Sequence, residues 1–150
     1  MTDLCGFFDD LVRCETRLYS ALSARLRERH GIVTSQFEFL RYIRDHPGCR
    51  VGALSVEFAV GVGAASKGVD RLERNGWVVR RANPSDRRSS LVALTGAGEE
   101  LLGAAEATFT AHLTEMVERA LTPPVVASAA RALSALRDTL ERDQVGMPAG

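Results

Sequence analysis

Few cysteines, no net charge and no long apolar run characterise this 150-residue sequence. Cys5, Cys14 and Cys49 form no CxxC pair and no cysteine–histidine cluster with zinc spacing, and their odd number speaks against a disulfide framework. No apolar run approaches the roughly 18 residues that cross a bilayer, and the start Met1-Thr2-Asp3-Leu4 lacks the basic residues of a secretory signal. We therefore expect a cytoplasmic protein with reduced thiols, no metal site and no membrane partner.

The sequence also lacks the motifs of common enzyme classes. It contains neither HExxH nor GxSxG, and the glycines at 61, 63 and 68 follow no predicted strand, so a nucleotide-binding fingerprint fails on context. His30, His46 and His112 fall on three different predicted helices or their ends. We expect no catalytic residues and no cofactor.

The composition indicates a globular domain with an uneven charge distribution. Hydrophobic residues make up 45% and charged residues 25% of the chain, which excludes collagenous and largely disordered classes. A net charge of zero, taken alone, speaks against a nucleic-acid binder. Residues 1–49 are neutral, but residues 50–95 hold eight basic against four acidic residues (+4), and residues 96–150 hold four against eight (−4). This pattern is expected if only the middle of the chain contacts phosphate.

Apolar residues at spacings of three and four predict a mainly α (α+β) fold. The expected helices cover residues 4–30, a segment opened by a capping box at Ser35-Gln36-Phe37-Glu38, residues 51–58, residues 61–76, a long segment capped by Thr95, and a segment starting at Thr122-Pro123. The inner faces of the third and fourth helices are expected to hold Leu54, Ala65, Val69 and Leu72. Strand-forming residues at 77–80 and 90–94, joined by the turn signal Asn83-Pro84-Ser85-Asp86, predict a two-stranded hairpin.

Two short helices followed by a basic hairpin give the order of a winged helix-turn-helix. Lys67, Arg71 and Arg74 are spaced four and then three apart, which places three cations along one stripe of helix 61–76. Arg87 and Arg88 lie at the hairpin tip. In such a module the second helix enters the major groove, and the hairpin reaches the minor groove, whose narrow A·T stretches attract arginine. A solvated charged surface has the same pattern, and Arg74 could instead pair with acids.

Four short segments carry a family resemblance. They are Leu54-Ser55, residues 69–78 (VDRLERNGWV), Asp86-Arg87-Arg88-Ser89, and residues 94–98 (LTGAG). The combination of RLExxGxV, then DRR, then LTxxG at these spacings is specific, and the similarity in element order covers nearly the whole chain. With these segments the chain resembles the MarR family of multiple-antibiotic-resistance-type transcriptional regulators.

The resemblance implies a homodimer that binds a palindromic operator in double-stranded DNA, with repression relieved by a small molecule. Residues 1–32 and 96–145 would form the helical dimerisation region, residues 33–95 the DNA-binding domain with recognition helix 61–76 and wing 77–94, and residues 146–150 a flexible tail. Independently, a heptad-like seam in the last helix favours packing on a partner. Its residues are Val126, Ala129, Leu133, Leu136 and Leu140.

The resemblance also implies which residues contact DNA: Ser66, Lys67, Arg71, Arg74, Asp86, Arg87, Arg88 and Ser89. Asp86 would hold Arg88 in position for insertion into the minor groove, and Arg87 would contact backbone phosphate. The recognition helix departs from the family at its start, where Gly61-Val62-Gly63-Ala64-Ala65 replaces a Ser/Thr-rich segment. Specificity could then rest on alanine contacts with thymine methyl groups, on later residues, or on DNA shape. Gly68 is consistent with close packing or with a soft helix.

An effector of small lipophilic or phenolic type is implied between the dimer helices and the winged lobe. The candidate lining residues are Tyr19, His30, Phe37, Phe39, Arg41 and Tyr42, although aromatic residues at helical spacing also form cores. Two alternatives stay open: a redox-sensing regulator that uses Cys5 or Cys14, and a winged-helix protein-interaction module without DNA binding. The glycine-rich helix start favours the second alternative, whereas Arg71, Arg87 and Arg88 oppose it.

Overall fold

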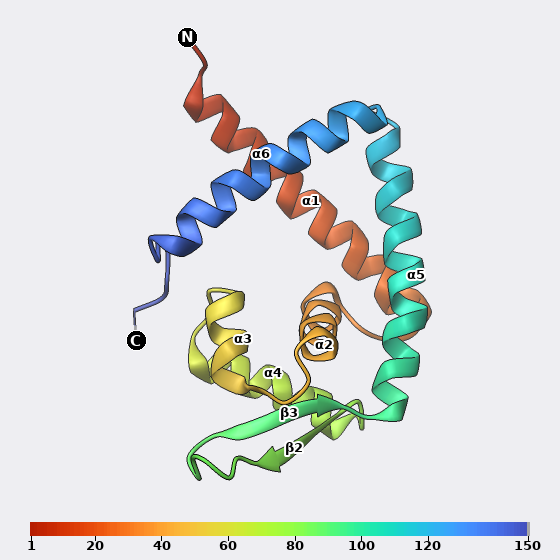
Figure 1. The fold of residues 1–150 in the computed structure, drawn as a ribbon. Helices are drawn as coiled ribbons and strands as arrows, with labels where there is room; N and C mark the ends of the chain where they lie inside the picture. The colour runs from red at the N-terminus through yellow and green to blue at the C-terminus, as the bar shows by residue number, and fades with distance from the viewer. Residues whose placement is uncertain (150) are drawn as a thin grey trace.

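The computed structural model describes residues 1–149; residue 150, the end of the predicted tail, lies outside the described residues. The elements follow in the order α1 (Leu4–His30), α2 (Thr34–Asp45), β1 (Cys49–Arg50), α3 (Val51–Glu57), α4 (Val62–Arg74), β2 (Val78–Ala82), β3 (Ser90–Leu94), α5 (Gly96–Glu118) and α6 (Pro123–Arg142). In Figure 1, α1 and α6 cross at one end, α5 runs along one side, and α2, α3, α4 and the sheet form a lobe at the other end. The predicted mainly helical winged-helix fold is confirmed.

The two halves of α1 have different surroundings. Leu22 and Leu26 near the C-terminal end are buried against the lobe, whereas the large apolar residues near the start are exposed. Those exposed residues are Leu4, Phe7, Phe8 and Val12. Gly31, with φ +70°, ends the helix in the left-handed conformation that glycine adopts without a steric penalty.

The apolar faces of the short helices meet in one core. Leu54 of α3 and Ala65, Val69 and Leu72 of α4 are fully buried, as the sequence predicts. The core also contains Leu40 and Ile43 of α2, Val78 and Val92 of the sheet, and Leu102 and Ala105 of α5. Helix α4 is therefore fixed by its inner face and turns its outer face away from the core.

The turn between α3 and α4 is closed by a side chain. The Ser55 hydroxyl is buried and donates to the Val60 carbonyl oxygen at 2.6 Å. Ala59 within this turn has φ +50°, a left-handed conformation that is costly for a residue with a Cβ atom.

The sheet has three strands in the order β1-β3-β2, one more than the two strands of the predicted wing. The predicted hairpin is present, with Val78 opposite Leu94 and Ala82 opposite Ser90. The missed strand β1 pairs antiparallel with β3, with Cys49 opposite Val92. Two residues are too few to show strand periodicity, so this pairing depends on tertiary contact.

The start of α2 also differs from the expectation. The N-cap is Val33, and the Gln36 side chain reaches back to accept a hydrogen bond from the Val33 backbone N–H at 3.0 Å. The predicted capping box at Ser35 and Glu38 is therefore wrong in register. The carboxamide of Gln36 at the third helical position satisfies an N–H group that the helix leaves free.

The start of α5 packs directly on the backbone of Trp77. Thr95 is the N-cap, as predicted: its hydroxyl accepts from Gly98 N–H at 3.1 Å and donates to the Gly76 carbonyl oxygen at 2.6 Å. A Cβ atom on Gly98 would collide with the Trp77 carbonyl group. The LTxxG segment therefore joins α5 closely to the end of the recognition helix.

Candidate nucleic-acid interface

The outer face of α4 carries three exposed cations, Lys67, Arg71 and Arg74. Among residues 1–149 none of them forms an ion pair, so Arg74 does not pair with acids as the alternative would have it. Ser66 is half-buried on the side of α4 that faces the sheet, and its carbonyl oxygen accepts a hydrogen bond from Arg80 at 3.1 Å. The structure therefore groups Lys67, Arg71 and Arg74 as free charges and gives Ser66 a backbone contact with the wing.

The wing tip is built by a network of short hydrogen bonds. Buried Asn83 accepts from the Ser85 N–H at 3.0 Å and donates from Nδ2 to the Ser89 hydroxyl at 2.9 Å. The Asp86 carboxylate accepts from the backbone N–H of Arg88 at 2.9 Å. Asp86 thus contacts Arg88 through the main-chain N–H group of Arg88. Ser89 is likewise bonded within the wing.

Arg81 was missed as a site residue. Arg80 and Arg81 follow each other on β2, and successive strand residues point to opposite faces. Arg80 turns toward α4, whereas Arg81 is exposed. Strand alternation in the sequence could have separated the two. Five exposed arginines and one lysine thus make up what we call the basic surface: Lys67, Arg71 and Arg74 on α4, and Arg81, Arg87 and Arg88 on the wing.

A cleft of 830 Å³ lies between α1, α2 and the recognition helix. Tyr19 and Phe39, two of the candidate effector residues, line it together with Lys67 and Arg71. Burial raises the pKa of the Glu38 carboxyl group in this cleft, and burial together with the negative charge of Glu38 raises the pKa of the Tyr19 phenol. The cleft thus combines aromatic surface with charges of both signs.

The same cleft explains Gly68. A Cβ atom at this position would lie 2.8 Å from Cε2 of the Phe39 ring. Between the two interpretations left open by the sequence, the structure supports close packing: the glycine lets Phe39 lie against α4.

The other candidate effector residues lie elsewhere. Phe37 is fully buried and stacks on Phe109 of α5 with ring centroids 4.4 Å apart. His30 Nε2 and the Thr108 hydroxyl share a hydrogen bond of 2.7 Å. Phe37 and His30 line none of the clefts described here, so grouping them with Tyr19 in one pocket is wrong. Arg41 and Tyr42 line a separate cleft of 440 Å³.

The three cysteines are free thiols. Cys5 and Cys14 are exposed on α1. Cys49 is half-buried in β1, and burial raises the pKa of its thiol, which keeps it protonated and unreactive. Within residues 1–149 no cluster of three His, Cys, Asp or Glu side chains could hold a metal ion, and no helix is long and apolar enough to cross a membrane.

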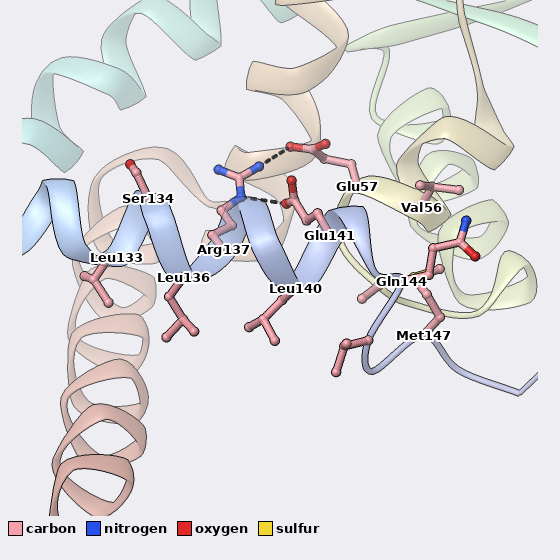
Figure 2. Close-up of a pocket in the computed structure, with 12 residues that line it drawn as sticks. Val56, Glu57, Leu133, Ser134, Leu136, Arg137, Leu140, Glu141, Gln144 and Met147 are labelled. Atoms are coloured by element: carbon pink, nitrogen blue, oxygen red, sulfur yellow. Dashed lines mark hydrogen bonds and ion pairs between the residues drawn. The ribbon is translucent and has the colours of Figure 1, made fainter. Parts of the chain in front are cut away.

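An apolar stripe lies exposed on α6. The helix starts at the predicted cap Thr122 and buries none of its residues. Leu133, Leu136 and Leu140 are nevertheless aligned, and Figure 2 shows their side chains pointing to the same side of the helix. They line a groove of 920 Å³ between α6 and α3, which Val56 also lines.

The same groove contains an ion pair that joins α6 to α3 of the lobe. Arg137 Nη2 donates to Glu57 Oε1 of α3 at 3.0 Å, and Arg137 Nε donates to Glu141 Oε1 at 2.6 Å (Figure 2). The Glu141 and Glu57 carboxylates raise the pKa of the Arg137 guanidinium further above its usual value. This ion pair holds α6 beside α3 at the groove that the three leucines also line.

Comparison with known proteins relates this chain to one family of transcriptional regulators. A model described as the MarR family matches residues 32–90. The transcriptional regulator HosA of Escherichia coli is 35% identical over 91 residues, which cover 59% of this chain and 67% of HosA. Other curated relatives are matched over about half of their own length.

Solved structures share the fold over almost the whole chain. A mutant E. coli MarR complexed with operator DNA has a TM-score of 0.72 and 28% identity, covering 90% of this chain and 99% of that one. Sco3205, a MarR family regulator from Streptomyces coelicolor in complex with DNA, has a TM-score of 0.83 and 24% identity, covering 95% and 90%, a likeness of fold. Because motif order, a curated relative and the fold agree, the chain belongs to the MarR family of winged-helix transcriptional regulators.

Proposed function

We propose that the protein is a homodimeric transcriptional repressor that binds an inverted-repeat operator through α4 and the wing. The observation that carries this proposal is the basic surface of six exposed cations, none of which has an ion-pair partner within residues 1–149. Unpaired cations beside a helix that fits the major groove can neutralise phosphates and release counterions. The relatives crystallised with DNA support the same use of the fold.

A second copy of the chain is the partner that fits α1 and α6. Both helices expose large apolar residues, which stay hydrated in a single chain. Burying one such side chain is favourable by about 1.5–3 kcal/mol relative to leaving it exposed to water. Residues 1–32 and 96–145 would form this dimerisation region. A two-fold dimer then places its two recognition helices on half-sites roughly 10 bp apart.

The cleft between α1, α2 and α4 is the effector site we favour. Lys67 and Arg71 line it and also belong to the basic surface. A phenolic or other aromatic ligand would stack on Tyr19 or Phe39, and an anionic group on it would bind the two cations. Occupation of the cleft therefore competes with DNA for the same charges and relieves repression.

The test is fluorescence-anisotropy binding to duplex DNA from the region upstream of the protein's own gene, at several salt concentrations. Arg88→Ala removes one wing cation from each subunit, so a dimer should lose roughly tenfold in affinity and its log–log salt slope should decrease by about 1.8. Arg119→Ala removes an equally exposed arginine from the end of α5 and is the matched control. Its affinity should stay at the wild-type value.

Three results would contradict the proposal. The first is wild-type binding that does not weaken with salt, because phosphate contacts require salt dependence. The second is an equal loss in Arg88→Ala and Arg119→Ala. The third is a stoichiometry of one subunit per operator, which would exclude the dimer.

A further inference from the structure

Arg80 differs from every cation of the basic surface in being fixed by protein contacts. Its side chain is 25% exposed, and Nη2 forms an ion pair with Asp70 Oδ1 at 2.8 Å and donates a hydrogen bond to the Ser66 carbonyl oxygen at 3.1 Å. Its backbone N–H donates to Glu73 Oε2 at 3.2 Å. All three partners lie on α4, so a single β2 residue attaches the recognition helix at three points.

These points can fix how α4 is rotated about its own axis. Ser66, Asp70 and Glu73 are spaced four and three apart, so they form one stripe along about 10 Å of helix. A stripe bonded to β2 at both ends and in the middle leaves α4 little freedom to turn. The rotation decides which side chains face outward, and Lys67 and Arg74 lie on the side of α4 away from the core.

The Arg80–Asp70 pair also changes the charge of this surface. The Asp70 side chain is 46% exposed, and Asp70 follows Lys67 by three residues on α4. Left unpaired, its carboxylate would repel the phosphates that the neighbouring cations attract. The guanidinium of Arg80 at 2.8 Å neutralises it.

Stability alone does not account for an arginine here. Within the described residues, Arg80 Nε is buried without a hydrogen-bond partner, which is unfavourable. Partly buried ion pairs contribute little net stability, because desolvation offsets their attraction. The position of α4 and the neutrality of Asp70 are what this arrangement provides.

We propose that Arg80 is a positioning residue of the DNA-binding surface, which fixes the rotation of α4 against the wing and neutralises Asp70 without contacting DNA. The proposal rests on the proposed function of α4 and the wing in DNA binding. It separates Arg80 from its neighbour Arg81, which is exposed and free to contact phosphate.

The experiment is a double-mutant cycle on the full-length protein, with operator affinity as the readout. Arg80→Gln should weaken binding roughly tenfold, because Asp70 becomes an uncompensated charge. The double variant Arg80→Gln with Asp70→Asn should bind the operator about threefold more tightly than Arg80→Gln alone, because the repelling charge is gone. Arg81→Gln is the matched control: its loss should not be recovered by Asp70→Asn.

Hydrogen–deuterium exchange of the free protein tests the attachment without DNA. Arg80→Gln should accelerate exchange within residues 62–74 but not within residues 34–45, and Arg81→Gln should accelerate neither. Arg80→Lys keeps a cation beside Asp70 but lacks the planar fork that reaches Ser66 as well. It should lose less affinity than Arg80→Gln and still accelerate exchange in α4, and it supplies the test if Arg80→Gln does not fold.

The outcomes separate this proposal from the proposed function. Wild-type affinity in Arg80→Gln, or no recovery by Asp70→Asn, would overturn the role of Arg80 even though the protein binds DNA. Unchanged exchange in α4 for both Arg80 variants would overturn the attachment. If the wild type binds no DNA, the proposed function fails, while the exchange measurement still decides whether Arg80 fixes α4.

Discussion

Replacement of Gly98 by alanine should destabilise the protein strongly. Gly98 is buried in the first turn of α5, and a Cβ atom there would collide with the Trp77 carbonyl oxygen and lie 2.9 Å from the Trp77 carbonyl carbon. Because both partners are backbone atoms, no side-chain rotation relieves the contact. Either α5 or the chain leaving the recognition helix has to move.

The magnitude follows from three contributions. Overpacking of this kind costs about 1–3 kcal/mol. Displacement of Gly98 would also weaken its hydrogen bond to the Thr95 hydroxyl, a cap that contributes about 1 kcal/mol. The higher helix propensity of alanine returns up to about 1 kcal/mol. We therefore expect a net loss of about 2 kcal/mol, or a decrease in Tm of roughly 4–8 °C for a chain of this length.

Gly103→Ala is the matched control on the same helix. Gly103 is exposed, and a Cβ atom there would meet nothing within 4 Å. This variant should gain up to about 1 kcal/mol from helix propensity. Urea unfolding followed by circular dichroism, at one protein concentration because association shifts apparent stability, measures both variants. If Gly98→Ala and Gly103→Ala changed the free energy of unfolding equally and in the same direction, the close approach of α5 to Trp77 would be refuted.

Three further substitutions test other contacts. Ala59→Gly relieves the left-handed strain at φ +50° and should raise the free energy of unfolding, measured with urea, by about 0.5 kcal/mol. A lower free energy of unfolding in this variant would show that Ala59 is not strained. Gly68→Ala should cost about 1 kcal/mol by the same assay, less than Gly98→Ala, because the Phe39 ring can rotate into the cleft. Burial raises the pKa of Glu38, so the folded state binds its proton more tightly and stability decreases as pH rises above the unfolded-state value. Glu38→Gln should therefore raise Tm at about pH 7 but not at about pH 4, and an equal gain at both would refute this assignment.

Local patterns predicted the helices and their buried faces because these depend on neighbours in sequence. Ala65, Val69 and Leu72 follow helical periodicity, and Thr95 caps α5 through a residue three positions on. The basic stripe of α4 was predicted for the same reason. The residues of the site that lie on one helix were thus accessible from spacing alone.

Long-range contacts account for what the sequence did not reveal. Phe37 was a candidate effector residue, yet Phe109 of α5 stacks on it and places it in the core. The strand at Cys49 exists because β3 lies beside it. Asp86 was expected to hold Arg88, and the structure shows that the bonded atom of Arg88 is its main-chain nitrogen. A charged residue type indicates that it has a partner without indicating which atom that partner supplies.

The contacts of α5 provide a physical route from the proposed dimerisation region to the proposed DNA-binding surface. Its first turn is joined to the end of α4 through Thr95, and further along the helix Glu106 pairs with Arg44 of α2 at 2.9 Å. These attachments join α5 to α2 and to the turn after α4, so the lobe should follow α5 as one rigid body. If two copies pair through α1 and α6, a change in the angle between their α5 helices would alter the separation of the two recognition helices. In the proposed dimer, packing far from the basic surface would therefore set the half-site spacing of the operator.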